Sequence, residues 1–165
     1  MPEMNKKIER KWLGHFLNTA APGEDAAYER IGVDLEEYNV EHSAQVEKKQ
    51  NILGQTSVKV TGYQKQASVA PYYAEKGSAL HTRLQAIIDD ELVLDDLRTD
   101  MIDVKLWETP TGNAYPAIRE EVYIEVTSHG GNASGYQIPF NVHYTGVKTK
   151  GTFDPAAKTF TPAEE

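Results

Sequence analysis

The 165-residue sequence contains no cysteine, which excludes disulfide bonds, thiolate chemistry and the metal sites that are easiest to recognise in a sequence. Basic residues are also few, because 17 Lys and Arg stand against 25 Asp and Glu. The resulting net charge of −8 argues against a surface that binds nucleic acid phosphates. It remains compatible with an acidic wall that repels DNA.

Long hydrophobic runs are missing as well. No segment approaches the roughly 20 apolar residues of a membrane span. The apolar stretch WLGHFL, residues 12–17, is too short and too interrupted for the core of a signal peptide. We therefore expect a protein without a membrane partner, made and used in the cytoplasm unless other machinery exports it.

Catalytic and metal-binding motifs are absent from the sequence. No two of the five histidines are four residues apart in an HExxH motif, and the acidic segment around residues 89–100 lacks the ligand spacing of a calcium loop. The segment GGNASG, residues 130–135, matches neither GxSxG nor GxGxxG and joins two expected strands. Tyr72 and Tyr73 have no basic surroundings that would favour nucleobase stacking. These observations predict no enzymatic activity, no cofactor and no metal.

The length suits one domain, with 39% hydrophobic and 25% charged residues. Residues 1–27 include the Pro-Gly stretch AAPGEDAA and are predicted to form an N-terminal arm. Residues 28–153 carry the regular patterns of a folded domain, and residues 154–165 are predicted to form a C-terminal tail. We expect the arm and the tail to become ordered against a partner.

Alternation of apolar and polar residues is the main structural signal. It recurs near residues 28–46, 58–60, 102–107, 122–127 and 138–144, which predicts β-strands. One helix is predicted near residues 78–92, because Leu80, Leu84 and Ile87 share a helical face and Ser78 can cap its start. The fold class is therefore mainly β, an antiparallel sandwich or barrel with one flanking helix. In the last three strands the even-numbered residues are apolar and are expected to face the core.

Residues 44–57 interrupt the alternation with charges, amides and a glycine. We interpret them as a long loop between two strands. The simpler alternative is that they extend a hairpin.

The ordered set of segments resembles the major tail tube proteins of bacteriophages with long, non-contractile tails. It runs through YERIGVDLEEYNVE, KKQNILGQTSVKVTGY, PYYAEKGSALHTRLQAIIDDE, VKLWE, REEVYIEV and QIPFNVHYTGVKTKGTFDP, and covers roughly residues 28–160. The resemblance implies a tail tube fold and six-membered rings of this chain, stacked into a tube through which double-stranded DNA passes without specific binding. It also implies the tape measure, terminator and distal tail proteins as partners, and a location in the virion tail after assembly in the host cytoplasm.

The resemblance further implies two sets of functional residues. The 44–57 loop would reach a neighbouring ring, with Lys48 and Lys49 facing acidic neighbours and Ile52 and Leu53 entering a pocket. A channel lining would be drawn from the polar faces of the later strands, and its candidates are Glu125, Thr127, Asn141 and His143. The alternative for Glu125 is an outer-surface charge paired with Lys105 on a neighbouring strand.

Two other readings remain open. A tube subunit of a contractile tail, a bacteriocin particle or a secretion apparatus would share the architecture. A small-ligand-binding barrel or an enzyme belongs to a different class and requires a deep pocket with converging polar groups.

Overall fold

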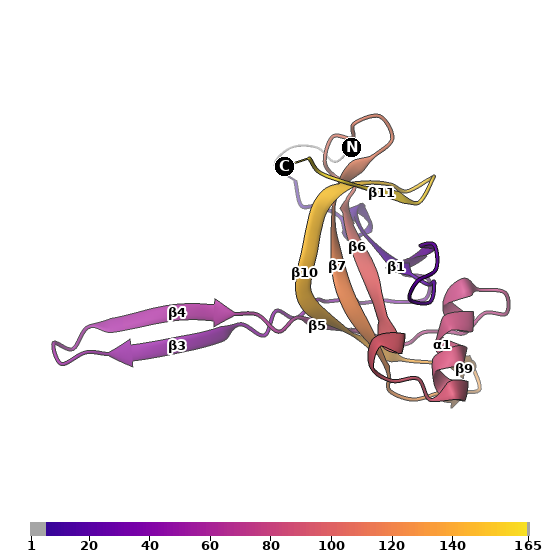
Figure 1. Ribbon diagram of the computed structural model, residues 1–165, viewed down its shortest axis with the longest axis horizontal. Helices are drawn as coiled ribbons and strands as arrows, with labels where there is room; N and C mark the ends of the chain where they lie inside the picture. Colours follow the sequence, from indigo (N-terminus) through magenta and orange to yellow (C-terminus); the bar gives the residue numbers. More distant parts are fainter. Residues whose placement is uncertain (1–5, 165) are drawn as a thin grey trace.

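The computed structural model describes residues 6–164, which form one antiparallel seven-stranded sheet, one helix and two small hairpins (Figure 1). The sheet has the order β11-β10-β7-β6-β1-β2, and β5 pairs with β10 beside this path. The strands are β1 (Leu13–Asn18), β2 (Tyr28–Ile31), β3 (Gln45–Gln50), β4 (Thr56–Gly62), β5 (Gln66–Val69), β6 (Arg98–Lys105), β7 (Tyr115–Val126), β8 (Gly130–Asn132), β9 (Gly135–Gln137), β10 (Phe140–Asp154) and β11 (Thr159–Pro162). The helix α1 spans Ala79–Asp90, and two 3₁₀ turns, η1 (Arg10–Trp12) and η2 (Leu94–Leu97), complete the described elements.

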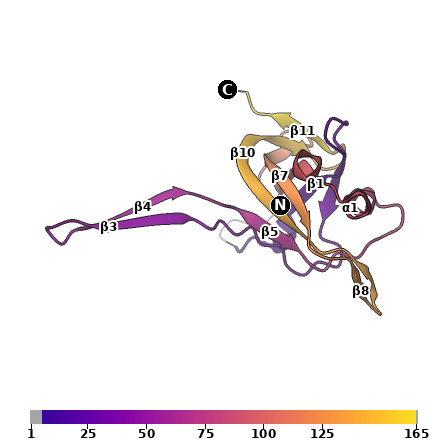
Figure 2. The same ribbon diagram turned by 60° about the horizontal axis from the view of Figure 1, so that its bottom comes forward.

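The prediction of a mainly β, antiparallel fold with one helix is confirmed. The sheet is curled, and α1 lies beside one of its faces (Figure 2). Its strand order is linear, so the described part of the sheet ends in edge strands and does not close into a complete barrel.

Both faces of the sheet carry an apolar core. On one face, Leu84 and Ile87 of α1 pack against a cluster that contains Met101, Val122 and Ile124. The other face carries a smaller cluster of Phe16, Tyr28, Ile102, Val104, Ala117 and Phe153. The curled sheet is therefore covered on both sides over part of its area.

The even-numbered apolar residues of the three later strands are buried or half-buried, as predicted, but they do not all face the same core. The register pairs Thr99 with Val122 and Ile102 with Arg119. Directly paired residues lie on the same face, so Ile102 and Val122 point to opposite sides of the sheet. The alternation within each strand was visible in the sequence, whereas the register between strands was not.

The helix begins where the sequence predicted. The Ser78 hydroxyl accepts a hydrogen bond from the backbone N–H of His81 at 3.4 Å. Glu29 of β2 adds a second cap, because its carboxylate accepts from the backbone N–H of Leu80 at 3.0 Å and from the Ser78 hydroxyl at 3.1 Å. An anionic group at a helix N-terminus is favourable, so this contact ties α1 to the edge of the sheet.

The boundaries of the predicted arm and tail need correction. Leu13–Asn18, assigned above to an N-terminal arm, form β1 between β2 and β6, and Phe16 and Leu17 are buried. Thr159–Pro162 of the predicted tail form β11 on β10. Gly151 of β10 permits this close pairing, because a Cβ there would collide with the carbonyl of Thr161 and the ring of Phe160. Residues 1–5 of the arm and residue 165 of the tail lie outside the described residues.

Candidate functional site

The β3–β4 hairpin extends away from the body of the molecule, and no other strand within residues 6–164 pairs with it (Figures 1 and 2). Its turn is held locally: the Asn51 side-chain carbonyl accepts from the backbone N–H groups of Leu53 and Gln55 at 2.9 and 3.0 Å. Gly54 takes a left-handed φ of 77°, which a side chain at this position would disfavour. The tip is therefore a defined turn of the hairpin.

The two faces of the hairpin differ in chemistry. Val46 pairs with Val60 and Lys48 pairs with Val58, so these residues share one face, which we call the valine face. Its three valines are 52%, 53% and 59% exposed, in the order Val46, Val60 and Val58. The opposite face carries Glu47, Lys49 and Lys59, with Lys49 and Glu47 in an ion pair of 3.0 Å.

An exposed two-stranded ribbon of this kind gains little stability from its own contacts, because such hairpins are marginal in water without a third strand or a packed face. Contiguous apolar residues rimmed by charge are typical of a surface that binds another protein. The valine face and the fully exposed tip residue Ile52 therefore form a candidate docking surface.

The structure places the four predicted contact residues on this hairpin but divides them. Lys48 lies on the valine face, Lys49 lies on the opposite face, and Ile52 and Leu53 form the tip. The segment is thus a hairpin, as the simpler alternative held, and its contact with a neighbour stays a prediction. Sequence reasoning missed the valine face because Val58 and Val60 were predicted only as part of a strand, with no partner strand assigned to them. The signal for it was their alternation directly after a polar turn.

Three of the four predicted channel residues lie together on the sheet face that points away from α1. Glu125 accepts a hydrogen bond from the Asn141 side-chain amide at 3.0 Å, and its other carboxylate oxygen is 3.4 Å from Nε2 of His143. Thr127 follows the end of β7, and its hydroxyl donates to the carbonyl of Pro139 at 3.0 Å. These side chains give β7 and β10 a polar, partly exposed strip with one carboxylate at its centre.

The alternative pairing of Glu125 with Lys105 does not occur. Lys105 pairs with Leu13 in β1, and β6 follows β7 only from Val104 to Arg98, opposite Ala117 to Tyr123. The register also puts Lys105 on the other face of the sheet, because its neighbour Val104 shares a face with Ala117. The two side chains are therefore separated by both register and face.

A buried polar network lies where the hairpin leaves the body. Lys65 and Glu120 form an ion pair of 2.7 Å, and the hydroxyls of Tyr38 and Tyr144 are 3.0 Å apart. Burial raises the pKa of both tyrosines above their usual range. A cavity of about 470 Å³ borders this network and is lined in part by Lys65, Lys148 and Tyr144.

His15 is the histidine whose environment most resembles that of a catalytic base. Its Nδ1 lies 2.6 Å from the Asp103 carboxylate and its Nε2 lies 2.8 Å from Nη2 of Arg10. Since a guanidinium only donates, Nε2 accepts from Arg10 and Nδ1 donates to Asp103. The ring is thus held between two charged groups in a structural role, with Arg10 at the position that a hydroxyl nucleophile would occupy.

Metal binding and membrane-spanning helices were the two remaining features to consider in the described residues. Within residues 6–164, no group of three or more His, Asp or Glu side chains is placed to hold a metal ion. In the same part of the chain, no helix is long and apolar enough to cross a membrane.

Comparison with known proteins gives a result at the level of fold. No protein-family model matches the sequence, and no curated protein matches it either. Among solved structures, the chain is similar to the sheath/tube terminator of PVC, an extracellular contractile injection system, in its extended state. The match has a TM-score of 0.56 at 9% identity and covers 88% of this chain and 99% of that chain. The chain therefore shares the fold of a component of a contractile injection system.

Proposed function

We propose that the chain is a structural subunit of a tail-like particle, which assembles with copies of itself into six-membered rings stacked around a channel. The observation that carries the proposal is the projecting β3–β4 hairpin, whose valine face and apolar tip are exposed in the single chain. A surface of that kind is explained by assembly, since its exposed apolar side chains add little to the stability of the isolated subunit.

The open sheet supports the same proposal. Edge strands present unpaired N–H and C=O groups, and β2 and β11 are the outer strands of the sheet path. In a closed ring, each edge would meet a neighbouring copy and no edge would remain exposed. The fold shared with a sheath/tube terminator adds support from an assembled particle of related architecture.

The finer form of the proposal is a tail tube subunit of a siphovirus-type phage. Its channel would pass double-stranded DNA without specific binding, and the net charge of −8 suits such a lumen because like charges repel the phosphates. Its other partners would be the tape measure, terminator and distal tail proteins. It would act in the virion tail after assembly in the host cytoplasm.

A second candidate is a terminator that forms one ring at the end of a tube. The fold shared with a terminator of a contractile injection system favours it. The same shared fold also fits a tube subunit of a contractile particle. The number of stacked rings separates a terminator from either tube subunit.

Sedimentation velocity and negative-stain electron microscopy of the purified protein test the proposal across a range of concentrations. Stacked rings or tubes are expected for a tube subunit, and single rings that do not stack are expected for a terminator. A chain that stays monomeric at every concentration and binds a small molecule would overturn both candidates in favour of a ligand-binding protein.

A further inference from the structure

The end of the molecule opposite the hairpin carries an acidic surface with apolar side chains at its centre. Residues 89–96 join α1 to η2 and contain five carboxylates and no Lys or Arg. Between the carboxylates, Val93 is 62% exposed and Leu94 is 79% exposed. We call residues 89–96 the acidic corner.

The acidic corner has a defined conformation. The buried Arg83 of α1 donates to the backbone carbonyl of Asp96 at 2.9 Å and to that of Arg98 at 3.3 Å, which fixes η2 against the helix. Leu94 takes a left-handed φ of 54°, which is costly for a residue with a branched side chain. Its exposed side chain is therefore held outward by a constrained turn.

The hairpin has the complementary composition. Residues 45–62 contain three lysines and one glutamate in a chain whose net charge is −8. Lys48 lies on the valine face and Lys49 and Lys59 lie on the opposite face of the same ribbon, while the carboxylates of the acidic corner flank Val93 and Leu94. Charge complementarity around an apolar centre is the usual composition of a specific protein contact.

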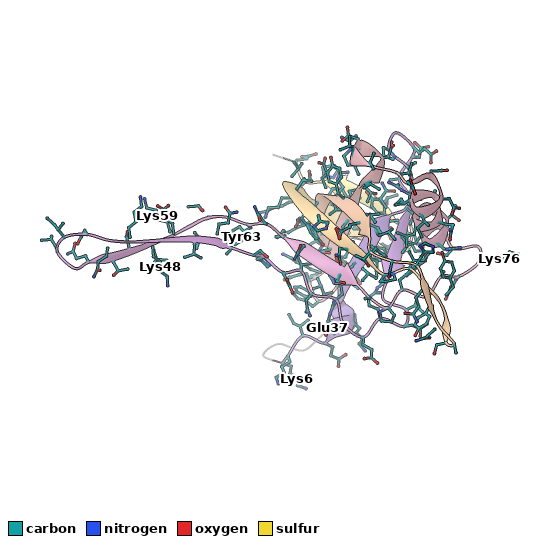
Figure 3. All side chains as sticks on the ribbon, turned by 90° about the horizontal axis from the view of Figure 1, so that it is seen from below. Lys6, Glu37, Lys48, Lys59, Tyr63 and Lys76 are labelled. Carbon is teal, nitrogen blue, oxygen red and sulfur yellow. The ribbon has the colours of Figure 1, made fainter. Side chains whose placement is uncertain are left out.

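The two surfaces also lie at opposite ends of the molecule. With the longest axis horizontal, the hairpin occupies one end and α1 the other (Figure 1). The view from below shows Lys48 and Lys59 on the hairpin, which projects from the body (Figure 3). Complementary patches on opposite ends of one chain join copies head to tail.

We propose that the β3–β4 hairpin of one copy docks on the acidic corner of a second copy. Lys48 lies against the carboxylates, and the valine face and tip cover Val93 and Leu94. Lys49 and Lys59, on the opposite face of the hairpin, add long-range attraction to the five carboxylates. This inference rests on the proposed function, since it names the acceptor that assembly through the hairpin requires.

Two other surfaces of the described chain fit the hairpin less well. The cavity at the hairpin base is lined by Lys65, which is paired with Glu120, and by Lys148, whose charge repels the hairpin lysines. The strip around Glu125 offers one carboxylate, but Asn141 and His143 already contact it. The acidic corner combines several carboxylates with exposed apolar side chains, and none of its carboxylates forms an ion pair within residues 6–164.

Charge reversal on both sides tests the contact. The hairpin variant carries Lys48→Glu, Lys49→Glu and Lys59→Glu, and the corner variant carries Asp90→Lys, Asp95→Lys and Asp96→Lys. Each variant alone is expected to raise the concentration needed for assembly at low salt by at least about tenfold, because every contact then brings like charges together. A control with Lys76→Glu, Lys150→Glu and Lys158→Glu makes the same charge change on exposed lysines outside the hairpin.

The decisive result is rescue in a chain that carries both sets of reversals. Its reversed hairpin again faces an acceptor of opposite charge, so assembly is expected to return toward the level of the parent. Zero-length carbodiimide cross-linking of the parent assembly, prepared from isotope-labelled and unlabelled chains, should join Lys48 to Asp90 or Asp95 of another copy.

The outcomes separate the inference from the proposed function. If the parent protein never assembles, both are overturned. If the parent assembles and the hairpin variant fails, but the corner variant assembles normally, the acceptor lies elsewhere and only this inference is overturned. Failure of the combined variant to regain assembly, together with cross-links from the hairpin to other acidic residues, overturns it in the same way.

Discussion

At the tip of the hairpin, Ile52 and Leu53 show how a side chain can matter for assembly without mattering for the fold. Ile52 is fully exposed and Leu53 is 76% exposed, and the turn is held by Asn51 rather than by either apolar side chain. Replacing the side chains of Ile52 and Leu53 therefore leaves the hydrogen bonds of the turn intact.

Replacing both residues, Ile52→Asp and Leu53→Asp, is expected to block assembly and to leave the melting temperature of the subunit within about 2 °C. Two carboxylates placed in an apolar contact would lose water without a partner, which costs several kcal/mol (on the order of 2–7) against association. Sedimentation velocity and thermal unfolding measure the two effects. Val33→Asp, at an equally exposed apolar position outside the hairpin, is the matched control. Normal assembly by the folded double variant would show that the tip makes no contact between subunits.

The role of the single residue Glu125 depends on whether its side chain faces the channel or the outside of the proposed tube. If it lines the channel, Glu125→Lys should still permit assembly but make the tubes retain DNA at low salt and release it as salt rises. The substitution replaces a repelling charge with an attracting one at each of six positions in a ring. Co-sedimentation of DNA with tubes at several salt concentrations measures retention.

Glu36→Lys is the control for this experiment, because it makes the same charge change at an exposed position outside the sheet. Equal DNA retention by Glu125→Lys, Glu36→Lys and parent tubes would place Glu125 outside the channel.

At the scale of elements, the hairpin and the sheet differ in what stabilises them. The strands β6 and β7 are buried between two apolar clusters, whereas β3 and β4, among the strands that the structure describes, pair only with each other. Local stability follows the buried contacts of a segment, so the hairpin should open far more often than the sheet in the free subunit.

Hydrogen exchange should therefore be fast in residues 45–62 of the free subunit and slow in the same residues of the assembly. Residues 13–18 should be protected in both states, because β1 lies inside the sheet. Mass spectrometry of peptides from subunit and assembly measures both. Equal protection of the hairpin in the two states would contradict its docking on another copy.

For the whole molecule, the buried tyrosines predict a loss of stability at high pH. Burial raises the pKa of Tyr144 and Tyr38 in the folded state, so the folded chain keeps protons that the unfolded chain releases above its tyrosine pKa of about 10. The free energy of unfolding should be unaffected by these groups below pH 10. Above it, each tyrosine should lower that free energy by about 1.4 kcal/mol per pH unit.

Urea unfolding of the parent and of Tyr144→Phe between pH 8 and pH 11 measures this slope. The variant lacks one of the buried hydroxyls and should lose stability less steeply above pH 10, although it starts lower because Tyr38 loses a hydrogen-bond partner. Tyr63→Phe, at an exposed tyrosine, should keep the slope of the parent. Identical slopes for Tyr144→Phe and the parent would show that the buried hydroxyl does not control the alkaline transition.

The whole molecule also shows which parts of the fold were readable from the sequence. The helix was predicted closely because the spacing of Leu80 and Leu84 and the cap at Ser78 are local signals. The burial of β1 was missed because Leu13–Asn18 are flanked by charged residues and a Pro-Gly loop, and only pairing with β2 and β6 makes the segment a strand. The shared surface of Glu125, Asn141 and His143 was readable from alternation, whereas the valine face required the register between β3 and β4.

The hairpin stands outside the core, so its length is independent of the packing of the body. Adding two residues to each strand would move the tip outward by roughly 6.6 Å and keep the valines on their present face, because side chains alternate with a period of two. Adding one residue to each strand would turn the outer part of the ribbon over. The distance between neighbouring subunits in the proposed particle is therefore adjustable in even steps, and natural insertions in this segment should come in matched pairs across the two strands.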